Sequence, residues 1–197
     1  MLIRYILCTV IAYLLGSISN GILIAKKSGH DIRSEGSKNT GASNALRVLG
    51  LKAGILTFVT DALKAVAAVL IGKALCGENG GMLAGLFVII GHNWPCFFGF
   101  AGGKGIACSV GVLLVMQPLF GGIAVLVTLI VIATTKYISV GSLTMVTLFA
   151  LFMLIFRPFF PHFIWALVLA ALAFYRHRTN LQRLMNGTEN KLGAKKK

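Results

Sequence analysis

Long apolar stretches, separated by short polar and glycine-rich ones, dominate the sequence. Seven apolar segments can be marked, at residues 5–25, 52–74, 82–99, 106–117, 119–135, 138–156 and 159–175. A helix that crosses a bilayer needs about 20 apolar residues, and most of the segments fit that length. The pattern predicts an all-α, polytopic integral membrane protein in which residues 1–197 form a single membrane-embedded domain.

The first segment could be mistaken for a signal peptide, because Arg4 precedes it. The apolar run, however, extends from Tyr5 to Ala25, and Lys26 and Lys27 follow it. A run of spanning length with a basic stop is typical of a retained helix.

The stretch 106–135 decides the number of spans. As one helix it would be about 45 Å long, against a hydrocarbon core of about 30 Å. Gln117–Pro118 interrupts the stretch. Basic residues favour cytoplasmic loops, and they crowd both loop 26–52 and the tail, which ends in Lys195–Lys197. Loop and tail share a side only if the helix count is odd. We therefore predict seven transmembrane helices, the fourth and fifth short and broken near Pro118, with the N-terminus outside and the C-terminus cytoplasmic.

Composition supports this class. The chain is 57% hydrophobic and only 12% charged, whereas soluble domains are roughly 25% charged, which excludes a soluble globule, disorder, collagen and a coiled coil. Nineteen Lys and Arg against five Asp and Glu give a net charge of +14. Basic residues in cytoplasmic loops and phosphate binding explain this excess of positive charge better than nucleic-acid binding does. A nucleic-acid-binding module would interleave basic and aromatic residues in a soluble domain, and this sequence does not. We expect a lipid bilayer as partner and no nucleic acid.

The cysteines and acids suggest no metal or cofactor. Cys8, Cys76, Cys96 and Cys108 form no CxxC pair or His/Cys cluster. The sequence also shows no Ser-His-Asp set and no paired carboxylates. We therefore predict no metal site and no cofactor, and a chemistry that suits an anion without a strong protein base.

A first polar motif covers Gly36–Asn44, with Arg47 three residues beyond it. Glycines and hydroxyl residues can direct several donors to one anion, and Arg47 would add a bidentate donor for phosphate. Ser43 or Asn44 could cap a helix running into Ala45–Leu49. The alternative is a glycine-rich loop of no special function.

A second motif runs from Gly91-His92-Asn93-Trp94-Pro95 to Gly102-Gly103-Lys104-Gly105. His92 ends a strongly apolar helix, which is a costly place for an imidazole. The glycines around Lys104 expose backbone N–H groups and suit phosphate. The alternatives are an interfacial histidine bonded to a carbonyl and an ordinary loop lysine.

Two further groups are candidates. Asp61 and Lys64, at i and i+3 inside the second segment, share a face and can pair, either for function or only to orient their helix. Ser139 and Ser142, between the fifth and sixth segments, could donate to a phosphate or cap a helix.

A third motif, His177–Glu189, follows the last segment. On a helix continuing from that segment, His177 and Asn180 share a stripe, and Arg183 adds a donor. The alternative is a basic juxtamembrane helix on anionic lipid.

The three motifs resemble those of a known family, the acylphosphate:glycerol-3-phosphate acyltransferases of bacterial membranes (the PlsY type). The matching stretches are GSKNTGASNALR at 36–47, GHNWPCFFGFAGGKG at 91–105 and HRTNLQRLMNGTE at 177–189. Ser43 stands where threonine is common, and Ile106-Ala107-Cys108 where valine-alanine-threonine is common.

The resemblance implies transfer of a fatty acyl group from acyl phosphate to the sn-1 hydroxyl of glycerol 3-phosphate. The products are 1-acyl-glycerol 3-phosphate (lysophosphatidic acid) and phosphate, in the first step of phospholipid biosynthesis. It implies a bacterial cytoplasmic (inner) membrane enzyme with its active site at the cytoplasmic face. We also expect transient contact with the enzyme that produces acyl phosphate.

Residue roles follow from combining the motifs with this reaction. His92 orients or deprotonates the hydroxyl, or merely shapes the site. Asp61, Lys64 and Glu189 are structural or support other residues. The expected catalytic residues are His92, Lys104, Ser37 and Asn180. The expected substrate- and phosphate-binding residues are Ser37, Asn39, Gly41, Ser43, Asn44, Arg47, Lys104, Ser142, His177 and Asn180.

Two other functional classes compete with an enzyme. An organic-phosphate transporter would place Asp61–Lys64 at the midplane, but transporters often show inverted repeats, and no repeat is visible here. A non-enzymatic lipid-binding scaffold leaves Gly102–Gly105 without a purpose.

Overall fold

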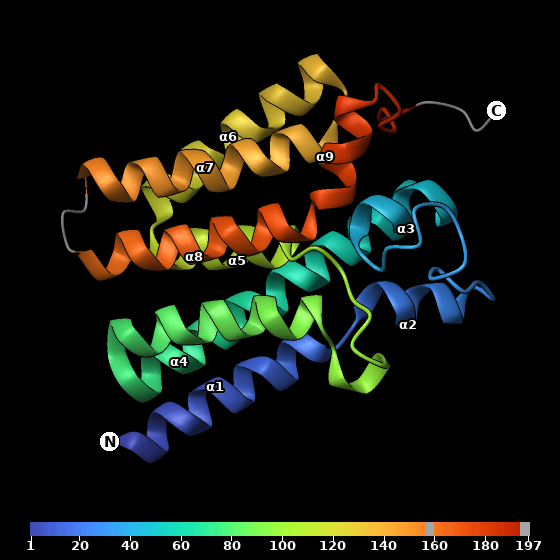
Figure 1. Ribbon diagram of the computed structural model, residues 1–197. Coiled ribbons are helices and arrows are strands. Elements are labelled where there is room, and N and C mark those ends of the chain that lie inside the picture. Colours follow the sequence, from blue (N-terminus) through green and yellow to red (C-terminus); the bar gives the residue numbers. More distant parts are fainter. Residues whose placement is uncertain (157–159, 194–197) are drawn as a thin grey trace. The chain divides into compact units, whose positions relative to one another are not determined.

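Helices make up all the regular secondary structure in residues 1–156 and 160–193, which this computed structural model describes (Figure 1). Arg157 and Lys195–Lys197 lie outside the described residues. The chain divides into two compact units, Met1–Met116 and Gln117–Lys197. The first unit contains α1 (Leu2–Ser17), α2 (Asn20–Lys27), α3 (Ala42–Leu49), α4 (Leu51–Asn93), the 3-10 turn η1 (Cys96–Phe98) and α5 (Ile106–Met116). The second contains α6 (Pro118–Thr135), α7 (Ile138–Phe156), α8 (Phe160–Arg176) and α9 (Arg178–Met185).

The all-α prediction is confirmed for the described residues. Within residues 1–156 and 160–193, four stretches are long and apolar enough to cross a membrane: Leu2–Lys27, Leu51–Phe98, Pro118–Thr135 and Ile138–Phe156. The apolar helices α5 and α8 are shorter.

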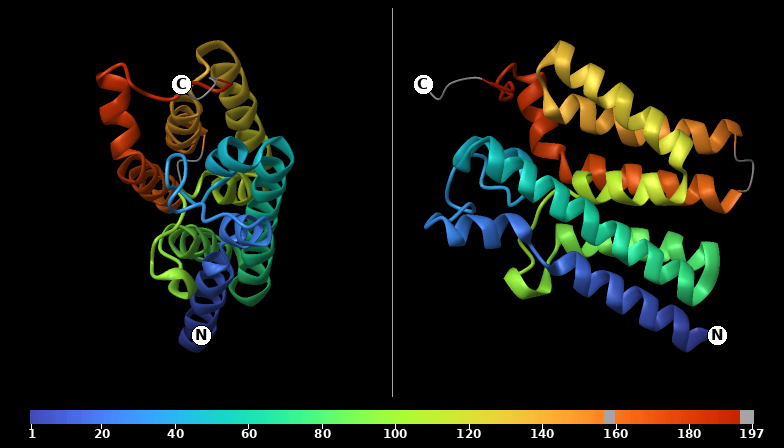
Figure 2. Two further views of the ribbon diagram at one scale, coloured as in Figure 1. Left: turned by 90° about the vertical axis from the view of Figure 1, so that its right-hand side faces the viewer. Right: turned by 180° about the vertical axis from the view of Figure 1, so that it is seen from behind.

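In the first unit, α1 and α5 both pack against α4 (Figures 1 and 2). The approach of α1 to α4 is close because two glycines face the opposing backbone. A Cβ atom on Gly16 would collide with the carbonyl oxygen of Val88, and one on Gly91 would collide with that of Tyr13. Small residues are what allows two apolar helices to pack backbone against backbone in a bilayer.

Helix α4 is a hairpin of two helices. Cys76 and Gly77 have non-helical backbone angles, with Gly77 at φ 63°, a value that glycine adopts without strain. The two halves correspond to the predicted segments 52–74 and 82–99, but the second half ends earlier, at Asn93. It ends there because Pro95 has no N–H to continue the helix and starts the η1 turn.

The predicted first helix, 5–25, is wrong in one respect, since it breaks between α1 and α2. Ile18 and Ser19 are extended, with ψ of 105° and 90°. The break leaves backbone carbonyls without helical N–H partners. The ammonium of Lys64 replaces these partners, because it donates to the carbonyl oxygens of Gly16 (2.9 Å) and Ile18 (2.6 Å).

The predicted break near Pro118 is confirmed, at Gln117, whose φ is −144° and ψ is 75°. Helix α5 is short, with 11 residues, as predicted. Helix α6 has 18 residues and is not short, because Pro118 occupies its first turn, where proline fits without loss.

In the second unit, α7 packs against both α6 and α8. The core between α7 and α8 includes Phe149 and Trp165, whose rings meet edge to face at 6.1 Å. The expected continuation of the last apolar helix through the third motif is wrong, because α8 ends at Arg176 and α9 begins at Arg178. At the break, the Nδ1–H of His177 donates to the carbonyl oxygen of Ala173 (2.8 Å).

Glu189 ties the C-terminal segment to α9 and to the start of α7. Its Oε1 accepts hydrogen bonds from the Oγ of Ser139 (2.9 Å) and the Nδ2 of Asn180 (2.6 Å), and its Oε2 pairs with the Nε of Arg183 (2.7 Å). The side chain is only 6% exposed. Burial alone would raise the pKa of Glu189, but the three donors outweigh burial and hold the pKa below its usual value. This geometry supports a structural role for Glu189.

We predict that Glu189 stabilises the folded protein at neutral pH and loses this effect in acid. Because its folded pKa is lowered, the stabilisation is complete above the unfolded pKa of about 4.3 and disappears as pH falls through the folded value. Glu189→Gln should cost roughly 1–3 kcal/mol at pH 7, since bonds to a charged group are lost. Melting curves of the detergent-solubilised protein at pH 7 and pH 4 measure both effects.

Glu78→Gln is the matched control, because Glu78 is 46% exposed and its oxygen lies 3.7 Å from Lys73. That variant should melt close to the parent protein. Equal melting temperatures for Glu189→Gln and Glu78→Gln would contradict the assigned role of Glu189.

Candidate functional site

Lys64 lies at the centre of a buried charged network in the first unit. Besides the two backbone carbonyls of the α1–α2 break, its Nζ lies 2.9 Å from the Oδ1 of Asp61, so the predicted i, i+3 pair is confirmed. The same Nζ lies 3.2 Å from the Nδ1 of His92, which comes from the other half of α4. The side chains of Lys64 and Asp61 are 7% and 1% exposed, so the pair is shielded from water.

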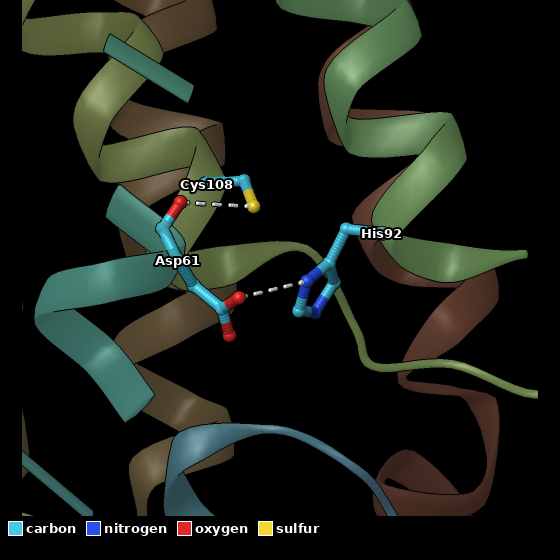
Figure 3. A group of neighbouring side chains, drawn as sticks. All are labelled: Asp61, His92 and Cys108. Atoms are coloured by element: carbon cyan, nitrogen blue, oxygen red, sulfur yellow. Dashed lines mark hydrogen bonds and ion pairs between the residues drawn. The ribbon is translucent and has the colours of Figure 1, made fainter. Parts of the chain in front are cut away.

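Asp61 collects contacts from three elements. Its Oδ1 accepts a hydrogen bond from the Nδ2 of Asn20 at the start of α2 (3.0 Å) and lies 3.6 Å from the Nδ1 of His92. The thiol of Cys108, on α5, donates to the backbone carbonyl of Asp61 (3.3 Å). Figure 3 shows His92 and Cys108 facing Asp61 from different helices. The network therefore joins α1, α2, both halves of α4 and α5.

Asp61, His92 and Cys108 also have the donor types of a metal site, and their ligand atoms lie within 4.8 Å of one another (Figure 3). The ammonium of Lys64, however, already contacts Asp61 Oδ1 and His92 Nδ1. A metal ion would compete with that ammonium for the same lone pairs. The residues present therefore do not fit a resident metal, and we assign none to them.

His92 connects this network to the glycine-rich end of the second motif. The sequence left open an interfacial histidine; the structure instead buries it, 5% exposed, beside Lys64 and Asp61. The N–H of Gly103 donates to the His92 carbonyl (3.0 Å), and a Cβ atom on Gly103 would collide with the imidazole Nε2. Only a glycine at 103 therefore allows the loop that carries Lys104 to lie against the ring.

The first motif is held by Asn44. Its Nδ2 donates to the carbonyl oxygens of Ile32 (3.1 Å) and Glu35 (3.0 Å), and its Oδ1 accepts from the N–H of Ser37 (2.8 Å). Both amide hydrogens are committed to the loop, so the structure supports Asn44 as its organiser rather than as a phosphate donor. The expected helix cap at Ser43 or Asn44 is wrong: Gly41 is the N-cap, and α3 starts at Ala42.

The first and second motifs meet within the first unit. The Nδ2 of Asn39 lies 3.5 Å from the carbonyl oxygen of Gly102, and its Oδ1 accepts from the N–H of Gly41 (3.0 Å). Ser37, Ser43 and Arg47 are partly buried, and within the described part of the chain their side chains make no hydrogen bond or ion pair. Two hydroxyls and one guanidinium of the first motif thus keep donors for a ligand.

The candidates of the second unit are partly committed to the protein itself. The hydroxyl of Ser142 donates to the carbonyl oxygen of Ile138 (2.8 Å), and Asn180 donates to Glu189. Helix packing buries Ser142, His177 and Asn180. Their contribution to substrate binding stays a prediction from the motifs.

Sequence reasoning missed four residues of the first unit. Asn20 carries no motif signal, and Cys108 was considered as a possible metal ligand and not as a partner of Asp61. Asn93 and Thr40 are buried, at 0% and 2% exposed, and the amide of Asn93 and the hydroxyl of Thr40 have no hydrogen-bond partner among the described residues. Buried polar groups in proteins are nearly always satisfied, so these atoms mark places for water or substrate. Asn93 and Thr40 lie inside the second and first motifs, and that position was the available signal.

Comparisons with known proteins agree on one family. A family model described as glycerol-3-phosphate acyltransferase matches residues 6–187. The glycerol-3-phosphate acyltransferase of Thermoanaerobacter sp. (strain X514) is 51% identical over 191 residues, covering 96% of each chain. The protein of the same description from Clostridioides difficile (strain 630) is 44% identical over 199 residues, covering 98% of this chain and 97% of that one.

The fold is also similar to two crystal structures of PlsY, an integral membrane glycerol 3-phosphate acyltransferase. The glycerol 3-phosphate form has a TM-score of 0.92, 38% identity and 96% coverage of both chains. The lysophosphatidic acid form has a TM-score of 0.89 and 38% identity, covering 96% of this chain and 95% of that one. This chain therefore belongs to the glycerol-3-phosphate acyltransferase family.

Proposed function

We propose that this protein acylates the sn-1 hydroxyl of glycerol 3-phosphate with an acyl group taken from acyl phosphate. The observation that carries the proposal is the meeting of the first two motifs in one unit, where Asn39 contacts Gly102 and the first motif keeps the donors of Ser37, Ser43 and Arg47. Membership of the family supplies the acceptor, glycerol 3-phosphate, and favours an enzyme over a transporter. The donor is our proposal: both polar substrates would then carry phosphate, which suits a site rich in N–H and cationic groups.

The loop of the first motif binds a phosphate in this scheme. Gly41 begins α3 without a side-chain cap, so the first N–H groups of that helix are available to an anion. The Ser37 and Ser43 hydroxyls add neutral donors. Arg47 and Lys104 hold the phosphate of glycerol 3-phosphate, as a planar fork and a point charge respectively. His177, Asn180 and Ser142 are proposed as further substrate-binding residues on the evidence of their sequence positions alone.

The chemical step needs positioning more than a protein nucleophile. Acyl phosphate is a mixed anhydride and already activated. The acceptor oxygen forms a bond to the acyl carbon, and the bond between that carbon and the phosphate oxygen breaks. The electron pair leaves with phosphate, which also accepts the hydroxyl proton. Catalysis then consists of holding the reactants together and stabilising charge on the acyl carbonyl and the leaving phosphate.

We further propose a seven-span topology in a bacterial cytoplasmic membrane, with the three motifs on the cytoplasmic face. The seven predicted segments correspond to α1, the two halves of α4, α5, α6, α7 and α8. The basic residues of loop 26–52 and of the tail support the orientation with the N-terminus outside. A transient contact with the enzyme that makes acyl phosphate would deliver the donor within the membrane.

Product formation by the purified protein tests the reaction. The full-length protein in detergent, given glycerol 3-phosphate and a synthetic acyl phosphate, should release phosphate and lysophosphatidic acid in equal amounts. Acyl-CoA or acyl-carrier protein in place of acyl phosphate should give no product. Turnover with either thioester would overturn the proposed donor, and transport without product would favour the organic-phosphate transporter.

We predict that Lys104→Ala and Arg47→Ala nearly abolish this activity. Truncating a partner that leaves an anion unpaired costs about 2–5 kcal/mol, which corresponds to at least tenfold in kcat/KM. Arg47→Lys should recover little, because the planar fork is lost. Steady-state kinetics with phosphate release as the readout measure each variant.

Lys27→Ala is the control for these charges, since Lys27 is an exposed basic residue at the end of α2. It should retain near-parental kcat/KM. If Lys104→Ala behaves like Lys27→Ala in correctly inserted protein, the Gly102–Gly105 segment is an ordinary loop and the proposed phosphate site is misplaced.

The topology predicts opposite sides for Asn79 and Lys27. Single cysteines at these two positions, on a background without the four native cysteines, should label from opposite faces with a membrane-impermeant reagent. Asn79 should label from outside and Lys27 from inside. Labelling of both from one face would rule out a span between them and with it the count of seven.

A further inference from the structure

The contact between Lys64 and His92 determines which nitrogen of the imidazole carries a proton. A lysine ammonium has three N–H donors and no acceptor. Four acceptor atoms lie within 3.2 Å of Nζ, so the Nδ1 of His92, the most distant at 3.2 Å, meets the ammonium as an acceptor that shares an N–H with a neighbouring acceptor. A neutral imidazole that accepts at Nδ1 carries its hydrogen on Nε2.

The competing partner is the carboxylate of Asp61. If His92 were instead hydrogen-bonded to Asp61, its Nδ1 would carry the hydrogen and donate it to the carboxylate. The unprotonated Nε2 could then act as a base. The distance from Nδ1 to Asp61 Oδ1 is 3.6 Å (Figure 3), which is beyond a hydrogen bond. The Oδ1 atom is moreover already engaged by Lys64 (2.9 Å) and by Asn20 (3.0 Å). Both observations favour Lys64 as the group that sets the ring.

The other edge of the ring faces the glycine-rich loop. A side chain at Gly103 would collide with Nε2, so this nitrogen lies directly against the backbone of the Gly102–Gly105 segment. The Gly103 N–H, which donates to the His92 carbonyl (3.0 Å), holds ring and loop in register. The hydrogen on Nε2 is therefore presented beside the segment that carries Lys104.

We infer that Lys64 is a positioning residue that fixes His92 as the Nε2–H tautomer, so that His92 donates a hydrogen bond in the site and does not accept the hydroxyl proton. Lys64 achieves this from the opposite side of the ring, where it is anchored by the carbonyls of Gly16 and Ile18. The inference rests on the proposed function for its catalytic meaning, but the tautomer itself is independent of turnover. The sequence left three roles open for His92. The Nε2–H tautomer favours a His92 that orients the acceptor hydroxyl over a His92 that deprotonates it.

Nitrogen NMR of the full-length protein in detergent, with ¹⁵N-labelled histidine, tests the tautomer. His92→Gln identifies the His92 signals, and the other three histidines, His30, His162 and His177, serve as internal references. We expect a protonated Nε2 and an unprotonated Nδ1 in the parent protein. A protonated Nδ1, alone or together with Nε2, would overturn the proposal without any variant.

Two matched variants separate Lys64 from Asp61. Asp61→Asn removes the carboxylate but leaves the ammonium with the carbonyl oxygens of Gly16 and Ile18 as acceptors, and it should keep the Nε2–H tautomer. The double variant Asp61→Asn/Lys64→Met removes both buried charges at once. It therefore leaves no unpaired carboxylate in the interior and should fold better than Lys64→Met alone. The double variant should lose the single tautomer. An unchanged His92 spectrum in the double variant would show that Lys64 does not set the ring.

Kinetics add a readout that a purely structural role would not move. Relative to Asp61→Asn, the double variant should lower kcat about tenfold or more, as expected for one lost bond to a developing charge, with little change in KM for glycerol 3-phosphate. A rise in KM at constant kcat would contradict a role for His92 in the chemical step. If the parent protein shows the expected tautomer but no acyl transfer, the proposed function fails while the assignment of Lys64 stands.

Discussion

The buried ammonium of Lys64 is the interaction on which the first unit depends. An ammonium cannot be left alone in a low-dielectric interior, so every acceptor around it is fixed in place. Here those acceptors are the carboxylate of Asp61, the imidazole of His92 and two backbone carbonyls of the α1–α2 break. A continuous helix would keep those carbonyls for itself. The break between α1 and α2 and the charge inside α4 are therefore one feature of the protein.

From this network the constraint extends outward through small residues. Gly16 and Gly91 let α1 lie against α4 closely enough for the carbonyls to reach Lys64, and Gly103 lets the next loop lie on His92. The hydroxyl of Tyr13 adds a hydrogen bond from α1 to the carbonyl of Trp94 (2.9 Å). The glycine contacts thus determine the geometry of the Lys64 network. That geometry in turn places the Gly102–Gly105 segment, which carries the proposed phosphate donor Lys104.

Periodicity and apolar length predicted much of this fold, because the bilayer demands helices wherever a long apolar run occurs. The sequence located the Gln117 break and the Asp61–Lys64 pair, since proline and an i, i+3 spacing act locally. It did not locate the break at Ile18–Ser19 or at His177. Neither has a proline; the first depends on Lys64, distant in sequence, and the second is a one-residue irregularity across which the backbone bonds of His177 and Leu181 continue. Likewise Asn44 fits a phosphate loop by type, and only the coordinates show its hydrogens committed to Ile32 and Glu35.

The distribution of acids explains why the proposed chemistry needs an activated donor. The chain has only five carboxylates, and each contacts a basic side chain: Asp31 with Arg33, Glu35 with His30, Asp61 with Lys64, Glu78 with Lys73 and Glu189 with Arg183. Four of these partners are Lys or Arg, and a carboxylate held by such a cation is a weak proton acceptor, because accepting the proton would abandon the pair. If Lys64 also commits His92 to donation, none of these groups is poised to deprotonate an alcohol. The proton must then leave with the released phosphate, which can accept it because cleavage of the anhydride bond leaves a new, unprotonated oxygen on that phosphate. A donor whose leaving group is phosphate thus supplies both the activation and the base that this side-chain set lacks.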